Sequence, residues 1–192
     1  MKGPARATNR AVTAIGAEWL LFARGAGATI DASPGADMSE HTATVRWQRN
    51  ADADFVRNRY SRAHEWHFDG GAVVPASASP SVVRVPLSDP AGVDPEEAFV
   101  AAVSSCHMLW FLSIAAANGY VVESYEDEAV GTMAKNADGK EWVADVVLRP
   151  RVAFGGNKLP DADAIEALHH EAHVECFIAN SVKSAIRVEP RA

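Results

Sequence analysis

The chain contains two cysteines, Cys106 and Cys176, whose thiols could act as nucleophiles or as the two halves of a disulfide. They are far apart in the sequence, and this separation does not establish whether the sulfur atoms meet in space. Free cysteines also occur as small apolar residues of a protein core, so neither residue alone is evidence for catalysis. Together they are candidates for a redox pair if the fold brings them close.

A second set of residues could bind a metal ion. The segment HHEAHVEC contains His169, His173 and Cys176, and the two histidines stand at i and i+4, the spacing of two ligands on one helix face. The order differs from that of zinc proteases, in which a glutamate directly follows the first histidine of such a pair. A zinc-binding module built from these three residues is therefore an alternative function.

Cys106 lies in the segment DPEEAFVAAVSSCHMLWFLSIAAANGY, residues 94–120, which predicts a long helix. Asp94 suits the N-cap, Glu97 completes a capping box, and the Asn-Gly pair suits the C-terminal end. Apolar residues lie on almost every side of this helix, so we expect it to be buried all round. One sheet of a chain this size covers one flank only, and we therefore predict that a second subunit covers the other.

Apolar and polar residues alternate in several segments on both sides of this helix, which predicts strands. We expect strands at 43–48, 62–68, 81–87, about 120–135, 141–154 and 184–189, and a second helix from Pro160 to near Cys176. This order predicts an α+β fold in which antiparallel sheets pack on the long central helix.

Two arginines in the predicted strands are candidate cations for a site. Arg62 shares its parity with Trp66 and Phe68, so in a regular strand it points inward, where it requires an anionic partner. Arg84 lies on the opposite face of its strand from Val83, and we expect it to point outward. Strand parity therefore favours Arg62.

The first 39 residues differ from the rest of the chain. Residues 25–40 are rich in Gly, Ala, Ser and Pro and show no apolar period, which is typical of a flexible segment. We expect residues 1–39 to be a flexible arm and residues 40–192 to be one domain. Strand-like alternation begins just after Met38, so a mis-assigned upstream start codon is an alternative explanation of the arm.

The composition excludes some partners. The chain has 18 basic and 25 acidic residues and a net charge of −7, which argues against general binding to nucleic acid or to an anionic membrane. Two cysteines in 192 residues are not the disulfide framework of a small secreted domain. We therefore expect a cytoplasmic protein with small-molecule or protein partners.

Three segments resemble the OsmC/Ohr family of organic hydroperoxide reductases. DPEEAFVAAVSSC is similar to the segment around the first cysteine, with the same spacing from Glu96 to Cys106. HVECFIANSVK is similar to the second-cysteine segment, and YSRAHEWHFDGG resembles the N-terminal hairpin of the OsmC-like branch. The resemblance covers about residues 40–190 and departs at Phe177, where many members have proline.

The resemblance implies a thiol peroxidase without metal, haem or other cofactor, working as an intertwined homodimer with active sites at the subunit interface. Cys106 would be the peroxidatic cysteine and Cys176 the resolving cysteine, joined in a disulfide after each turnover. A buried thiol needs a nearby cation to ionise. Arg62 would supply it and Glu96 would hold that arginine, with Arg84 as the alternative.

The same resemblance implies an apolar substrate pocket. Phe99, Trp110, Trp66 and Phe68 would line it and favour organic hydroperoxides over hydrogen peroxide. An external thiol or dithiol would reduce the enzyme again. The alternative with the same fold is a non-catalytic protein that binds a ligand or acts in stress.

Overall fold

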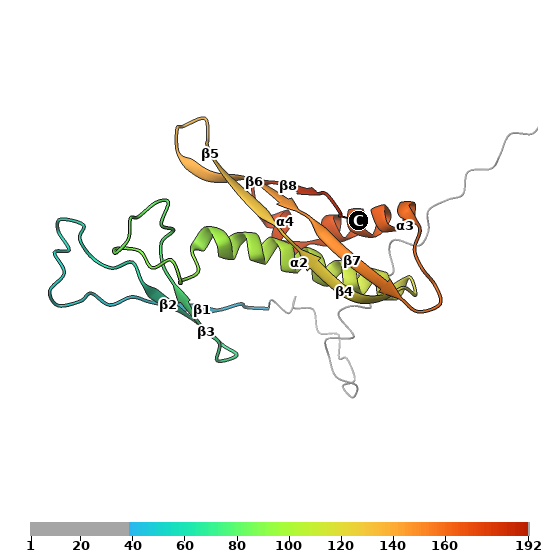
Figure 1. Ribbon diagram of the computed structural model, residues 1–192, viewed down its shortest axis with the longest axis horizontal. Helices are drawn as coiled ribbons and strands as arrows, with labels where there is room; N and C mark the ends of the chain where they lie inside the picture. Colours follow the sequence, from blue (N-terminus) through green and yellow to red (C-terminus); the bar gives the residue numbers. More distant parts are fainter. Residues whose placement is uncertain (1–38, 192) are drawn as a thin grey trace, which may run out of the picture. The chain divides into compact units, whose positions relative to one another are not determined.

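The computed structural model describes residues 39–191 (Figure 1). The predicted arm and the question of the start codon at Met38 therefore lie outside the described residues, apart from Ser39. Helix α2, Pro95–Ala117, carries Cys106 and follows the sequence prediction closely. Asp94 Oδ1 accepts a hydrogen bond from the backbone N–H of Glu97 at 2.7 Å, and the Asp94 N–H donates to Glu97 Oε2 at 3.1 Å. This capping box satisfies N–H groups that the first turn of a helix leaves without a partner.

The segment before α2 forms a small antiparallel sheet. Its strands are β1 (Ala43–Arg46), β2 (His64–Phe68) and β3 (Val73–Ala76), in the order β1-β2-β3. Val93, next to the N-cap of α2, exchanges backbone hydrogen bonds with the end of β3: its N–H donates to Pro75 O, and its carbonyl accepts from Ser77 N–H. The sheet is thereby joined to the start of the central helix.

The predicted strand at 81–87 is wrong, because this segment forms turns. The N–H groups of Val82 and Val83 both donate to Ser79 O, and Leu87 N–H donates to Arg84 O. Pro86 has no N–H for a strand ladder. The parity that placed Arg84 on an outward strand face therefore does not apply.

The segment after α2 forms four strands where the sequence predicts two. They are β4 (Val121–Asp127), β5 (Val130–Lys135), β6 (Glu141–Leu148) and β7 (Pro150–Gly155), followed by helix α3 (Ala162–Glu175), helix α4 (Phe177–Ser181) and strand β8 (Ala185–Val188). Strands β4 and β7 pair with each other, and β5, β6 and β8 form a second sheet in that order. The β6–β8 pair is parallel, unlike the predicted antiparallel pairing. The chain runs through β7, α3 and α4 between the two strands, which gives the long crossover connection that a parallel pair requires. The α+β class and the packing of the sheets on a long helix are as predicted.

Helix α2 is partly covered within one chain. It packs against α3, α4 and strands β4, β5 and β6, which lie along it in Figure 1. Only 33% of its most apolar 18-residue stretch is buried, although its length and composition alone would suffice to cross a membrane. Leu109 is 51% exposed. The prediction that the helix is buried all round is therefore not met by the single chain.

Two apolar clusters divide the buried side of α2. The first contains Trp110, Phe111 and Cys176, with Cys106 packed against it. The second is built on Val103 and strand β6, with Phe99 packed against it. The candidate thiols thus lie in the cluster between α2 and α3.

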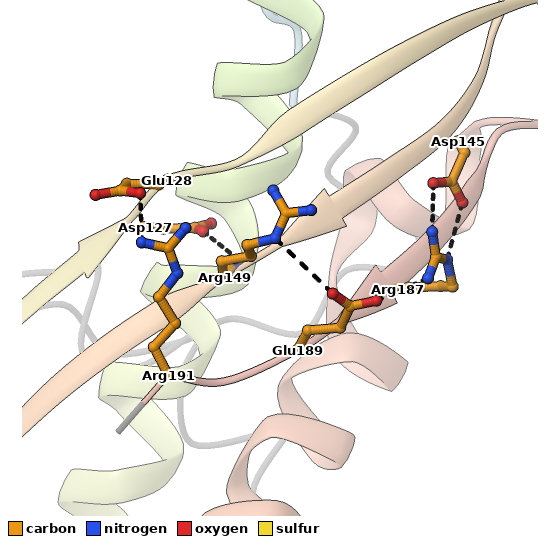
Figure 2. A network of polar contacts seen from close by, with 7 residues as sticks. All are labelled: Asp127, Glu128, Asp145, Arg149, Arg187, Glu189 and Arg191. Carbon is orange, nitrogen blue, oxygen red and sulfur yellow. Dashed lines mark hydrogen bonds and ion pairs between the residues drawn. The ribbon is translucent and has the colours of Figure 1, made fainter.

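A network of ion pairs and hydrogen bonds links strand β8 to neighbouring strand ends (Figure 2). Arg187 on β8 donates to both oxygens of Asp145 on β6, at 3.0 and 2.7 Å, and to Glu189 at 2.7 Å. Asp127 accepts from the backbone N–H of Arg149, and also from Ser104 Oγ on α2. The residues of the network are Asp127, Glu128, Asp145, Arg149, Arg187, Glu189 and Arg191. It connects the parallel β6–β8 pair to the strand ends next to α2.

Candidate active site

The fold brings the two cysteines together. Cys106 lies in the middle of α2, and Cys176 lies where α3 ends and α4 begins. Both thiols are free, and Cys106 packs against the apolar cluster that contains Cys176. Cys176 Sγ also accepts from Ala179 N–H at 3.4 Å, which caps the first turn of α4. The structure thus supplies the proximity that the sequence leaves open.

The two thiols have different surroundings. Cys176 is 1% exposed, whereas Cys106 is half-buried. Burial raises the pKa of Cys176 to about 11, and the neighbouring Cys106 thiol acts in the same direction. Cys176 therefore stays protonated at neutral pH.

Aromatic side chains border the thiol pair. Trp110 lies one helical turn after Cys106 and belongs to the same cluster as Cys176. The ring of Phe177, the residue after Cys176, meets Trp110 edge-on with centroids 5.5 Å apart. Of the four predicted pocket residues, the single chain places Trp110 with the thiols. Phe99 packs in the second cluster, and Trp66 and Phe68 lie on strand β2.

The guanidinium of Arg62 forms its hydrogen bonds with residues close to it in the sequence. It donates to Asn58 O at 3.2 Å, to Asn58 Oδ1 at 2.7 Å and to Tyr60 O, and it lies 3.8 Å from the centroid of the Tyr60 ring. Strand β2 begins only at His64, so the alternation that predicted an inward Arg62 does not extend to it. Arg62 also lines a cavity of about 430 Å³ together with Pro95 at the start of α2.

Glu96 lies in the first turn of α2, far along the helix from Cys106. The rise between positions 96 and 106 is about 15 Å at 1.5 Å per residue. Glu96 lines a larger cavity of about 740 Å³, whose wall includes Ser104, Ser105 and Met108 of α2. Glu96 and Cys106 of one chain therefore do not share a site.

A buried histidine pair, which is absent from the candidate pairs predicted from the sequence, joins helices α2 and α3. His107 Nε2 and His169 Nδ1 are 3.1 Å apart, and the two rings are nearly parallel. Phe111 stacks on His169 with centroids 4.3 Å apart. The signal was a histidine directly after Cys106 in an otherwise apolar stretch, because a buried imidazole needs a polar partner.

The predicted zinc ligands are not assembled. His169 faces His107 of α2, and Cys176 packs near Cys106 and accepts a hydrogen bond from the backbone of α4. Within residues 39–191, no group of three or more His, Cys, Asp or Glu side chains is placed to hold a metal ion. The geometry gives no support to a zinc-binding module.

The histidine pair predicts acid sensitivity of the fold. Burial, aided by the nearby His169 and His173, lowers the pKa of His107 to about 3, and burial lowers that of His169 to about 4. The unfolded chain takes up these protons near pH 6.5 and the folded chain does not, so stability is lost as the pH falls from 6.5 toward 4. We expect the free energy of unfolding to fall by up to about 1.4 kcal/mol per pH unit for each histidine.

Urea unfolding at several pH values between about 7 and about 4 measures how the free energy of unfolding depends on pH. This range runs from above the ordinary histidine pKa to well below it. His107→Gln should reduce the slope, because glutamine does not titrate. The matched control is His170→Gln, since His170 is an exposed neighbour on α3. An unchanged slope in His107→Gln would contradict the assignment.

Comparisons with known proteins agree with the architecture. The family model described as "OsmC-like protein" matches residues 88–191. No curated protein matches. An OsmC-like protein of unknown function from Vibrio cholerae is 58% identical in sequence, with a TM-score of 0.78, and the match covers 80% of this chain and 100% of that one.

More distant structures share the fold. The organic hydroperoxide resistance protein OhrB of Bacillus subtilis is 17% identical with a TM-score of 0.56, and the match covers 80% of this chain and 98% of that one. An organic hydroperoxide resistance protein OsmC from Legionella pneumophila is 14% identical with a TM-score of 0.52, covering 80% and 97%. With more than half of its length matched by the family model and a 58% identical relative, the chain belongs to the OsmC-like protein family.

Proposed function

We propose that the protein is a thiol-dependent peroxidase that reduces organic hydroperoxides to alcohols. The observation that carries this proposal is the contact between a half-buried Cys106 and a buried, protonated Cys176. The difference in exposure supports Cys106 as the sulfur that meets the peroxide, and the nearness of Cys176 supports its role as the thiol that reacts with the oxidised Cys106. The names of the Bacillus and Legionella relatives, organic hydroperoxide resistance proteins, agree with this substrate class.

The reaction proceeds in two steps. The Cys106 thiolate attacks the terminal oxygen of the hydroperoxide, so that an S–O bond forms and the O–O bond breaks. The alkoxide leaves and takes up the proton that Cys106 had released, giving the alcohol and a Cys106 sulfenic acid. Cys176 then attacks the sulfenic sulfur, which forms the Cys106–Cys176 disulfide and releases water.

An external dithiol completes the cycle. It reduces the disulfide to two thiols and is itself oxidised to a disulfide, so that two electrons pass from the dithiol to the hydroperoxide. The cycle uses no metal or other cofactor. A reducing, cytoplasmic compartment supplies such thiols.

The functional unit of the proposal is a homodimer. The exposed, apolar side of α2, with Leu109 and the wall of the 740 Å³ cavity, is the surface that a second copy would cover. Since Glu96 lies about 15 Å along the helix from Cys106 of its own chain, Glu96 and Arg62 would reach Cys106 from the second copy. Trp66 and Phe68, carried on the sheet that follows Arg62, would enter the pocket from the same side.

Thiol titration tests the proposed function. The reduced full-length protein is treated with one equivalent of cumene hydroperoxide and its thiols are counted after denaturation. We expect both thiols to be lost and to return with dithiothreitol, and we expect hydrogen peroxide to react more slowly. Two thiols that persist in the presence of cumene hydroperoxide would instead indicate a non-catalytic member of the family.

A further inference from the structure

Phe177 is a large, exposed apolar residue close in the sequence to one of the two thiols. It follows Cys176 directly and begins helix α4. Its side chain is 63% exposed, although it is a large apolar residue. An exposed ring is therefore carried by the residue that follows the buried thiol in the chain.

The contacts of Phe177 lead to the other thiol. Its ring meets Trp110 edge-on at 5.5 Å, and Trp110 is 6% exposed. Trp110 follows Cys106 by one turn, so both side chains lie on the same side of α2. Cys106 thus packs against the cluster that contains the buried Trp110, and Trp110 in turn contacts the exposed ring of Phe177.

The ring of Phe177 is not required by the local fold. Helix α4 buries none of its residues, and its cap is made by Cys176. Phe177 is the first residue of the helix, a position that accepts proline. An aromatic ring here leaves apolar surface in water that a second ring could cover.

We propose that Phe177 is a specificity-determining residue whose exposed face binds the aromatic group of an aryl hydroperoxide while the O–O bond lies at Cys106. This inference rests on the proposed peroxidase function and adds to it the class of organic group that is preferred. Aromatic pairs gain from edge-on or offset contacts at centroid distances of about 4.5–7 Å, beyond the area they bury. The Trp110–Phe177 contact lies in this range, and an aryl group on Phe177 extends the same arrangement. A small alkyl hydroperoxide gains less from it.

Steady-state kinetics of the full-length protein test the assignment, with cumene hydroperoxide and tert-butyl hydroperoxide as substrates. We expect Phe177→Ala and Phe177→Pro to lower kcat/KM for cumene hydroperoxide about fivefold and that for tert-butyl hydroperoxide less than about twofold. Phe177→Tyr should retain the preference for the aryl substrate. Leu159→Ala is the matched control, because Leu159 is an apolar residue of similar exposure, 65%, and should leave both values unchanged.

A binding measurement separates this inference from the proposed function. Cumyl alcohol, the aryl product, is titrated against the wild-type protein and Phe177→Ala by ligand-observed NMR. If cumyl alcohol binding depends on Phe177 but the wild type reduces no hydroperoxide, the binding site stands and the peroxidase proposal fails. The inference is overturned if the Phe177 variants lower kcat/KM for both substrates equally, or if cumyl alcohol binds Phe177→Ala as well as it binds the wild type. It is also overturned if Phe177→Ala changes the oligomeric state in size-exclusion chromatography.

Discussion

Replacing Cys106 by serine is expected to abolish the reduction of cumene hydroperoxide, with a loss of roughly a thousandfold or more in kcat/KM. A serine hydroxyl stays protonated at neutral pH and is a poor nucleophile without an adjacent base. Cys176 cannot take over, because it is 1% exposed and its pKa is raised to about 11. In this variant Cys176 should remain a free thiol after peroxide treatment.

Cys176→Ser is expected to behave differently. The first step needs only Cys106, so we expect one equivalent of alcohol per chain followed by arrest. Cys106 should then carry one added oxygen atom, detectable by intact-protein mass spectrometry and by trapping with dimedone. Excess hydroperoxide should convert this sulfenic acid to sulfinic acid.

The comparison of the two serine variants tests the assignment of roles. Both changes are nearly isosteric, and circular dichroism should confirm that both proteins fold. If Cys106→Ser retains the single turnover and Cys176→Ser loses it, then the roles are reversed and the difference in exposure is not what selects the reactive sulfur. If both variants turn over fully, the reaction does not use the pair.

Local signals explain why the long helix could be predicted from the sequence. Asp94 and Glu97 bond to each other within one turn, and the Asn118-Gly119 ending needs the positive φ of 74° that Gly119 adopts. Each signal depends on neighbours in the chain, and the structure has the helix at Pro95–Ala117. By contrast, alternating valines over 81–87 were not sufficient for a strand, because no partner strand pairs with this segment among the described residues.

The candidate site was less predictable because it depends on packing between distant segments. The contact of Cys106 with Cys176 arises from the crossing of α2 and α3, which periodicity does not fix. The His107–His169 pair depends on the same crossing. The predicted orientation of Arg62 relied on a regular strand, and the strand begins two residues later, at His64.

Mixed dimers are expected to show that each site takes residues from two chains. Arg62→Gln alone should lower kcat/KM about a hundredfold, since the Cys106 thiolate would lose its cation. A dimer of one Cys106→Ser chain and one Arg62→Gln chain, purified with two different tags, should recover about half of the wild-type activity, because one of the two symmetric sites is complete. Activity that stays at the level of the single variants would place Arg62 and Cys106 in the same chain.

A reciprocal mixture makes this test independent of how well the variant chains fold. A chain that carries both Cys106→Ser and Arg62→Gln is paired with a wild-type chain. If the sites are shared between chains, then the wild-type Cys106 faces Gln at position 62 and the wild-type Arg62 faces Ser at position 106, so this dimer should be nearly inactive. If each chain forms its own site, the wild-type chain should retain about half of the activity of the wild-type dimer. The two mixtures contain the same substitutions and the same number of altered residues, so their difference in activity reports only which chain supplies the arginine to Cys106.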